Sequence, residues 1–322
     1  MTRKKIIKIL KITLPLVLGV FLIIYSIGSA TEQERQILWQ NIRNANLFWL
    51  ILSAICGLLS HASRAYRWKY LIQPLGYKVG FANSFMAVMA AYLANLGIPR
   101  SGEVLRGASL ATYEKIPFQK VFGTIISERV ADLLMLLLIV AGTLLFHTTT
   151  LVTFFNEKNI NPFFSLLVLF ALVMFGLLFL RLIKKSKNKF LKRLKNFAIG
   201  ILDGMKSILK MRKTFAFLCH TVFIWAMYIC MFFLIKYAIP ETQNLGFGAI
   251  MVAFVVGSFA ISITNGGIGV YPIAVGAVLL LFGISKEAGE AFGWIVWGTQ
   301  TLLNLVIGGL SMLFLPIFNR SN

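Results

Sequence analysis

Three charged side chains stand close together in "NLGIPRSGEVLR", residues 95–106, within a chain otherwise rich in long apolar runs. Arg100, Glu103 and Arg106 recur every three residues, so a helix that starts near this point places them along one face. Guanidinium groups bind phosphate through parallel hydrogen bonds, and a carboxylate between them can act as a counter-charge or a proton relay. The stretch therefore predicts a polar cavity for an anionic, phosphate-bearing group.

A second charged group follows in "SERVADLL", residues 127–134. Glu128 and Asp132 share a helical face because they are four residues apart, and Arg129 lies beside them. The two groups together are electrically neutral, which suits a membrane interior, where an unpaired charge costs at least about 3 kcal/mol. A structural interpretation, in which the six residues are salt bridges that hold a bent hairpin, is the alternative, and both can hold together.

The composition of the chain shows which surroundings these charges have. Of its 322 residues, 58% are hydrophobic and 13% are charged, and the mean hydropathy is +0.80, outside the range of soluble globular domains. Only helices or closed barrels satisfy every backbone group in lipid, and the alternation of a barrel is missing. The sequence predicts an all-α, polytopic membrane protein that forms a single integral membrane domain over residues 1–322.

The apolar segments predict about six to eight transmembrane helices plus two helical hairpins. The first hairpin spans residues 80–117, since the charges of its second arm cannot face lipid. The second spans residues 246–283, where "NGGIGVYP" breaks the helix with glycines and a proline. We expect both to be re-entrant and oppositely inserted, because broken helices in corresponding halves are typical of inverted-repeat transporters.

The tip of the second hairpin has two interpretations. Its glycines either let helices pack closely or leave backbone groups to line a substrate path. The residues concerned are Asn265, Gly266, Gly267 and Gly269.

A third basic group, Arg64, Arg67 and Lys69, alternates with aromatic residues in "SRAYRWKY". Cations that snorkel to the membrane interface beside an aromatic belt explain this pattern. The alternative is a site where a lipid headgroup enters.

The distribution of the 32 lysines and arginines predicts the orientation of the chain. Most of them fall on one side of the membrane if both termini are cytoplasmic. Residues 184–213 combine an apolar face with a lysine-rich face, as in a helix that lies on the cytoplasmic leaflet. The net charge of +21 is thus explained by topology and by anionic lipid rather than by nucleic acid. We expect a multi-pass protein of the cell (inner or plasma) membrane.

Other chemistry has little support in the sequence. The three cysteines and three histidines are scattered without ligand spacing, so we expect neither a metal site nor a cofactor. The sequence contains no nucleotide-binding loop such as a Walker motif, which argues against direct use of ATP.

Residues 95–134 resemble the central motif of the lysylphosphatidylglycerol synthase transmembrane-region family. This UPF0104-type, flippase-like membrane domain also occurs in multiple peptide resistance factors. The segments "SRAYRW" and "GGIG" are similar to two other marks of the family. The resemblance implicates Asn95, Pro99, Arg100, Gly102, Glu103, Arg106, Glu128, Arg129, Asp132, Gly266, Gly267 and Gly269 in lipid binding and translocation. The chain departs from the family where Asn265 replaces a frequent proline and Pro272 a frequent glutamate, so its second hairpin lacks charged groups.

The resemblance implies a flippase or translocase that moves an anionic or phosphate-bearing lipid between leaflets. The expected partners are anionic membrane lipids, with a homo-oligomer or envelope-synthesis enzymes as further candidates. One alternative is a membrane-embedded enzyme on lipid-linked phosphate that uses Glu103, Glu128 or Asp132 as acid or base. Another is an accessory scaffold of envelope lipid synthesis. Because the sequence holds no Ser-His arrangement and no transferase domain, we do not expect an enzyme.

Overall fold

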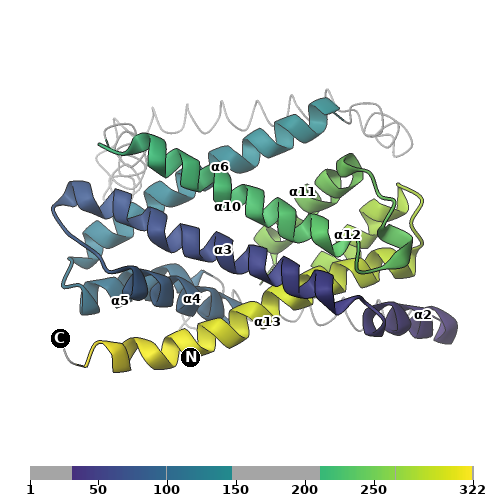
Figure 1. Ribbon diagram of the computed structural model, residues 1–322, viewed down its shortest axis with the longest axis horizontal. Helices are drawn as coiled ribbons and strands as arrows, with labels where there is room; N and C mark the ends of the chain where they lie inside the picture. Colours follow the sequence, from purple (N-terminus) through teal and green to yellow (C-terminus); the bar gives the residue numbers. More distant parts are fainter. Residues whose placement is uncertain (1–30, 99, 147–210, 265, 321–322) are drawn as a thin grey trace, which may run out of the picture. The chain divides into compact units, whose positions relative to one another are not determined.

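The computed structural model describes residues 31–98, 100–146, 211–264 and 266–320. Apart from short turns, these residues are helical, which confirms the all-α prediction for this part of the chain (Figure 1). The helices are α2 (Glu32–Arg43), α3 (Leu47–Ile72), α4 (Phe81–Gly97), α5 (Ser101–Tyr113), α6 (Phe118–Phe146), α10 (Thr214–Ile235), α11 (Phe247–Ile263), α12 (Val270–Leu280) and α13 (Lys286–Phe318). The predicted surface helix at 184–213 lies almost wholly outside the described residues.

Two compact units make up the chain. The first contains residues 1–122 and 215–322, and the second contains residues 123–214. Among the described residues, the first unit holds both hairpins, while the second holds most of α6. The prediction of one membrane domain over the whole chain stays a prediction.

Helix lengths distinguish full spans from shorter arms. Within the described residues, three helices are long and apolar enough to cross a membrane: Leu47–Leu75, Thr214–Ile235 and Lys286–Phe318. The apolar helices α4, α11 and α12 have only 17, 17 and 11 residues. At a rise of 1.5 Å per residue they reach about 16 to 26 Å, less than the roughly 30 Å of hydrocarbon. These lengths suit arms that end inside the bilayer, and re-entrant insertion itself stays a prediction.

The first hairpin is closed by polar contacts at its tip. The Asn95 side-chain oxygen accepts a hydrogen bond from the Gly102 backbone N–H at 2.8 Å, and the Ser101 hydroxyl donates to the carbonyl of Ala94 at 3.1 Å. Arg100 stands before α5 in the left-handed region with φ 61°. A Cβ added to Gly102 would lie 2.7 Å from the backbone carbon of Ala91, so the arms α4 and α5 are in backbone contact.

The second hairpin turns on its glycines. Gly266, Gly267 and Gly269 have φ of 67°, 81° and 72°, a region that side chains with a Cβ rarely adopt. The indole N–H of Trp297 on α13 donates to the carbonyl of Gly266 at 2.8 Å. The turn is therefore fixed both by glycine and by a contact from outside the hairpin.

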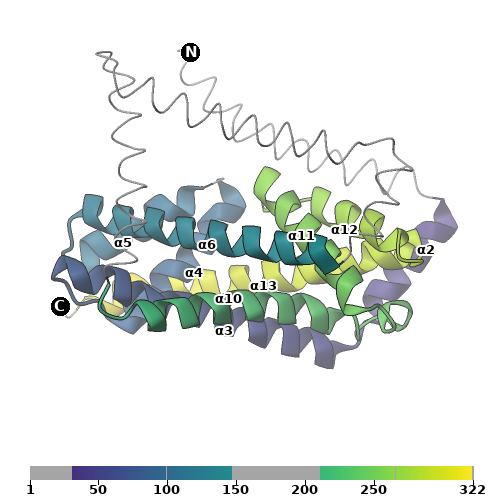
Figure 2. The same ribbon diagram turned by 90° about the horizontal axis from the view of Figure 1, so that it is seen from above.

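Helix α13 runs along both hairpins and joins them (Figures 1 and 2). A Cβ on Gly308 would lie 2.7 Å from the carbonyl oxygen of Met89 in α4, and one on Gly293 would lie 2.6 Å from Pro272 in α12. Close approach at these two glycines lets α13 contact both hairpins. The hairpin tips also meet, since a Cβ on Gly266 would lie 3.5 Å from the Leu96 side chain. The tips of the two hairpins thus approach each other within the first unit.

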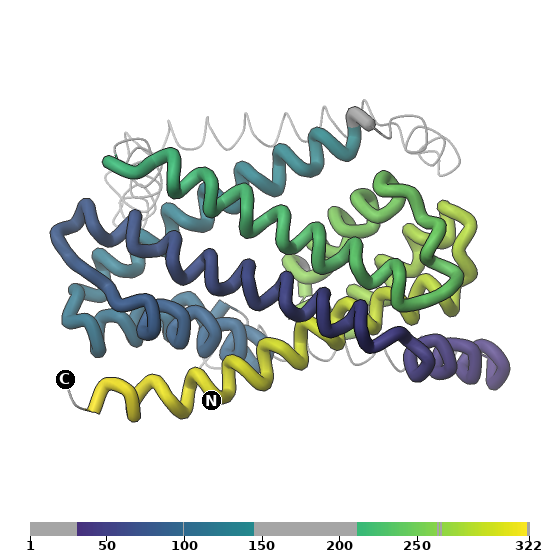
Figure 3. The backbone as a smooth tube through the Cα atoms, viewed as in Figure 1, coloured from purple at the N-terminus to yellow at the C-terminus, as the bar shows by residue number. Residues whose placement is uncertain are grey.

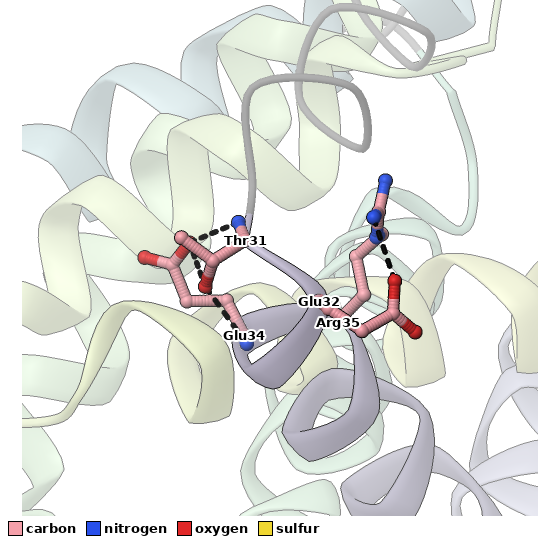
Figure 4. Close-up of polar contacts among 4 residues, drawn as sticks. All are labelled: Thr31, Glu32, Glu34 and Arg35. Carbon is pink, nitrogen blue, oxygen red and sulfur yellow. Dashed lines mark hydrogen bonds and ion pairs between the residues drawn. The ribbon is translucent and has the colours of Figure 1, made fainter.

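A capping box starts α2 (Figure 4). The Glu34 amide donates to the Thr31 hydroxyl oxygen at 3.2 Å, while the Thr31 amide donates to the Glu34 carboxylate at 2.6 Å. This backbone hydrogen bond lowers the pKa of Glu34 below its usual value. Helix α2 packs against α13. The chain then turns into α3 at Asn46 (Figure 3), and the backbone N–H of Asn46 donates to the carbonyl of Ala238 at 3.0 Å.

The Trp297 contact can be tested by substitution. Trp297→Phe removes the hydrogen bond to Gly266 and keeps an aromatic ring, so we expect a loss of about 1 kcal/mol and a lower Tm in detergent. Trp294→Phe is the control, since Trp294 contacts Trp297 through its ring and no hydrogen bond of its indole is recorded among the described residues. An equal fall of Tm in both variants would contradict the proposed role of the bond.

Candidate functional site

Three arginines of α3 and α5 are buried in the first unit. Arg64, Arg67 and Arg106 expose only 3%, 0% and 3% of their surface. The Arg106 guanidinium from α5 stacks on the Trp68 ring of α3 at 3.7 Å. Arg64 is four residues before Trp68 and thus on the same face of α3. We call Arg64, Arg67 and Arg106 the arginine cluster.

A third helix fixes Arg67. Its Nη1 donates to the Thr221 hydroxyl of α10 at 2.7 Å, and its guanidinium lies 5.0 Å from the Phe217 ring. Cationic side chains in the interior of a membrane protein mark functional sites by default, because burying them is costly. Planar guanidinium groups match phosphate oxygens and stack on aromatic rings, as Arg106 does here. The arginine cluster is therefore chemically suited to an anionic oxygen-rich group.

The three members of the "SRAYRWKY" group differ in their surroundings. Lys69 is half-buried, and its ammonium lies 3.2 Å above the ring of the exposed Tyr66. That placement fits a cation at the membrane interface. Burial of Arg64 and Arg67 does not fit snorkelling. Arg106, which the sequence had assigned to a separate site, stacks on Trp68 of the same helix α3.

The first hairpin tip holds the other predicted residues of α4 and α5. Arg100 is exposed and precedes the helix, so it leaves the face that carries Glu103 and Arg106. Glu103 is half-buried in the first turn of α5. Asn95 has a structural role in this conformation, because its oxygen holds the amide of Gly102. Of the predicted basic residues of this hairpin, Arg106 alone joins the arginine cluster.

Glu128, Arg129 and Asp132 lie on α6 in the second unit. Glu128 is fully buried and Asp132 is 7% exposed, while Arg129 is exposed and lies 3.7 Å from the Asp132 carboxylate. The helix therefore carries two buried carboxylates on one face. Their grouping with Arg106 across the two units stays a prediction.

At the second tip, Asn265 lies outside the described residues. A Cβ on Gly267 would lie 3.0 Å from Tyr271 and 3.2 Å from Ile261, so there is little room for a side chain there. Together with the left-handed backbone, this supports the close-packing interpretation of the tip glycines. The carbonyl of Gly266 is held by Trp297 in this conformation.

The family profile of the lysylphosphatidylglycerol synthase TM region matches residues 11–308. The chain belongs to this family. A UPF0104 membrane protein of Methanocaldococcus jannaschii is 33% identical over 129 residues, which cover 39% of this chain and 38% of that protein. The alignment thus spans less than half of the relative. No solved structure matches the chain.

Family membership agrees with the long apolar helices, and the chain is a multi-pass membrane protein. The resemblance of its sequence to the lysylphosphatidylglycerol synthase transmembrane family is confirmed. Among the described residues, no cluster of three or more His, Cys, Asp or Glu side chains is arranged to hold a metal ion.

A buried carboxylate beside the second hairpin was not predicted from the sequence. Glu290 of α13 is 8% exposed, and a Cβ on Gly276 of α12 would lie 2.8 Å from its Cγ. The hairpin itself carries no charge, as its departure from the family pattern indicated, yet an acidic side chain of another helix packs on it. The signal was a second glutamate, three residues after Glu287, where an apolar run begins in "KEAGEAFG".

Proposed function

We propose that this member of the family moves an anionic, phosphate-bearing lipid between the two leaflets. The observation that carries the proposal is the arginine cluster, buried beside a hairpin whose tip meets that of a second hairpin. A charged headgroup does not cross hydrocarbon unaided, because each unpaired charge costs several kcal/mol. Guanidinium groups inside the protein offset that cost, while the acyl chains stay in lipid.

The helix ends at the tips support an anionic substrate. Helix α5 begins at Ser101 and α12 begins at Val270, each directly after its tip. A helix N-terminus carries a partial positive charge, which favours anions. Both ends lie in the region where Leu96 approaches Gly266. The headgroup would thus move from the arginine cluster towards two positive helix ends.

The carboxylates have a place in this proposal. Glu103 is half-buried on the helix that carries Arg106, and Glu128 and Asp132 are buried on α6. We propose that Glu103 balances Arg106 when no lipid is bound, and that the carboxylates carry protons if transport is coupled to a proton gradient. The proposal further places both termini in the cytoplasm, the protein in the cell membrane, and anionic lipids as its partners.

Reconstitution into vesicles tests the function. The vesicles contain phosphatidylglycerol with a fluorophore on its acyl chain. A membrane-impermeant quencher reports, over time, the fraction of labelled lipid that has reached the outer leaflet. We expect faster exchange than in empty vesicles, with a partial loss in Arg100→Ala and in Glu103→Ala. Equal exchange in all preparations would reject the function for this lipid. Mass spectrometry of the same lipid separates an enzyme, which changes its mass, from a translocase, which does not.

A further inference from the structure

A fully buried histidine lies at the contact of three helices. His61 of α3 has 0% exposure, and its ring centroid lies 4.3 Å from that of Tyr92 in α4 and 6.1 Å from that of Tyr228 in α10. The two tyrosine hydroxyls are 3.1 Å apart. Among the described residues, neither ring nitrogen of His61 has a hydrogen-bond partner.

A second buried donor belongs to the same group of rings. The indole Nε1 of Trp225 is buried without a hydrogen-bond partner in the described part of the chain. Its ring centroid lies 6.1 Å from that of Tyr228. Each buried polar atom left in this state destabilises the fold, because its hydrogen bonds to water are lost and not replaced. An apolar ring would avoid this cost, so the polar atoms need an explanation other than stability in this conformation.

The position of His61 relates it to the proposed path. It precedes Arg64 by three residues on α3, which places it about one helical turn from the arginine cluster. Tyr92 precedes Leu96 by four residues on α4, which places it about one turn from the point where the hairpin tips meet. His61 and Tyr92 therefore connect the arginine cluster with the tips.

We propose that His61, Trp225, Tyr92 and Tyr228 form a second, uncharged subsite for the lipid headgroup, between the arginine cluster and the hairpin tips. The inference rests on the proposed function and deepens it. In the conformation described, α4 covers His61 through Tyr92, and the subsite is closed. When α4 separates from α3, one imidazole N–H and the indole N–H donate to phosphate or glycerol oxygens. Contact with these oxygens removes the desolvation cost of the closed state.

Accessibility of position 61 tests the opening of the subsite. In a background with Cys56, Cys219 and Cys230 replaced by alanine, His61→Cys is exposed to a small methanethiosulfonate reagent. Ser53→Cys is the control, since Ser53 is equally buried on α3, at 1% exposure, and lies eight residues before His61, about 12 Å along the helix. We expect phosphatidylglycerol to raise the rate at position 61 about tenfold over phosphatidylcholine and to leave position 53 unchanged. No rise, or an equal rise with both lipids, would overturn the inference.

Exchange kinetics give a second measurement. His61→Phe keeps the ring and removes both nitrogens, so we expect about tenfold slower exchange with a Tm that is unchanged or higher. His61→Gln should recover part of the rate, and Ser53→Ala should match the wild type. An unaltered rate in His61→Phe overturns the subsite, as does a loss of rate accompanied by a lower Tm. No exchange by the wild type would instead reject the proposed function, and accessibility of position 61 would then decide the subsite alone.

Discussion

Arg106→Ala is expected to slow the exchange of an anionic lipid about 100-fold, the effect of losing about 2.7 kcal/mol of interaction with the headgroup. Arg106 is buried, and its guanidinium is aligned on Trp68 at 3.7 Å. Stacking fixes the plane of the guanidinium, so that its N–H groups can meet two phosphate oxygens at once. Arg106→Lys keeps the charge and loses the planar fork, so it should recover only a small part of the rate.

Two controls make the Arg106 result specific. Arg43→Ala removes an exposed arginine of α2, outside the site, and should leave exchange unchanged. Arg106→Lys should retain the Tm of the wild type in detergent, which separates a loss of binding from a loss of folding. A wild-type rate in Arg106→Ala would exclude the arginine cluster from the path.

The breaks in the hairpins were predictable from local sequence. The three glycines in "NGGIGVYP" disfavour continuation of α11, which ends at Ile263. The proline does not break a helix as predicted, because Pro272 lies in the first turn of α12, where proline is tolerated. In the first hairpin, α5 begins at Ser101, within the stretch where charged residues replace apolar ones. Both signals are local, since each lies within a few residues, so they can be recognised without knowing how the helices pack.

The arginine cluster could not be assembled from sequence alone. Alternating basic and aromatic residues look the same whether the cations snorkel to an interface or lie inside the protein. Arg67 lies inside the protein because it contacts Thr221 and Phe217 on α10, which are far away in the chain. Arg106 likewise contacts Trp68 on α3. Burial here is a property of helix packing, which local patterns do not specify.

His61 and Glu290 escaped the sequence argument for a related reason. Neither residue belongs to a motif on which the sequence-based predictions were built. Their surroundings are supplied by other helices: Tyr92 and Tyr228 lie against His61, and Gly276 lies against Glu290. A glycine opposite a long side chain is recognisable only after the two helices are placed.

The shared contacts of α13 suggest how the two hairpins act together. Gly308 packs on the first hairpin, Gly293 packs on the second, and Trp297 holds the second tip. Helices that approach each other this closely cannot slide freely, because protein interiors are tightly packed. A movement of the first hairpin away from α3 would therefore be transmitted along α13 to the second.

Gly102→Ala is expected to open the tip of the first hairpin and to slow exchange strongly. The new Cβ would lie 2.7 Å from the backbone carbon of Ala91, closer still to its carbonyl oxygen, and 2.8 Å from the Asn95 side-chain oxygen. Backbone atoms cannot rotate away, so α4 and α5 must separate and the hydrogen bond from Gly102 to Asn95 is lost. Overpacking of this kind costs about 1 to 3 kcal/mol.

The matched control for Gly102→Ala lies in the same hairpin. Gly97→Ala adds the same methyl group where no atom stands within 4 Å of the new Cβ, and the backbone there is helical. It should keep the Tm and the exchange rate of the wild type, whereas Gly102→Ala should lower the Tm by several degrees and slow exchange at least about tenfold. If both variants behave alike, close contact between α4 and α5 is not what the function requires. If Gly102→Ala alone fails, the packed tip is part of the machinery, because the two substitutions differ only in what the added carbon meets.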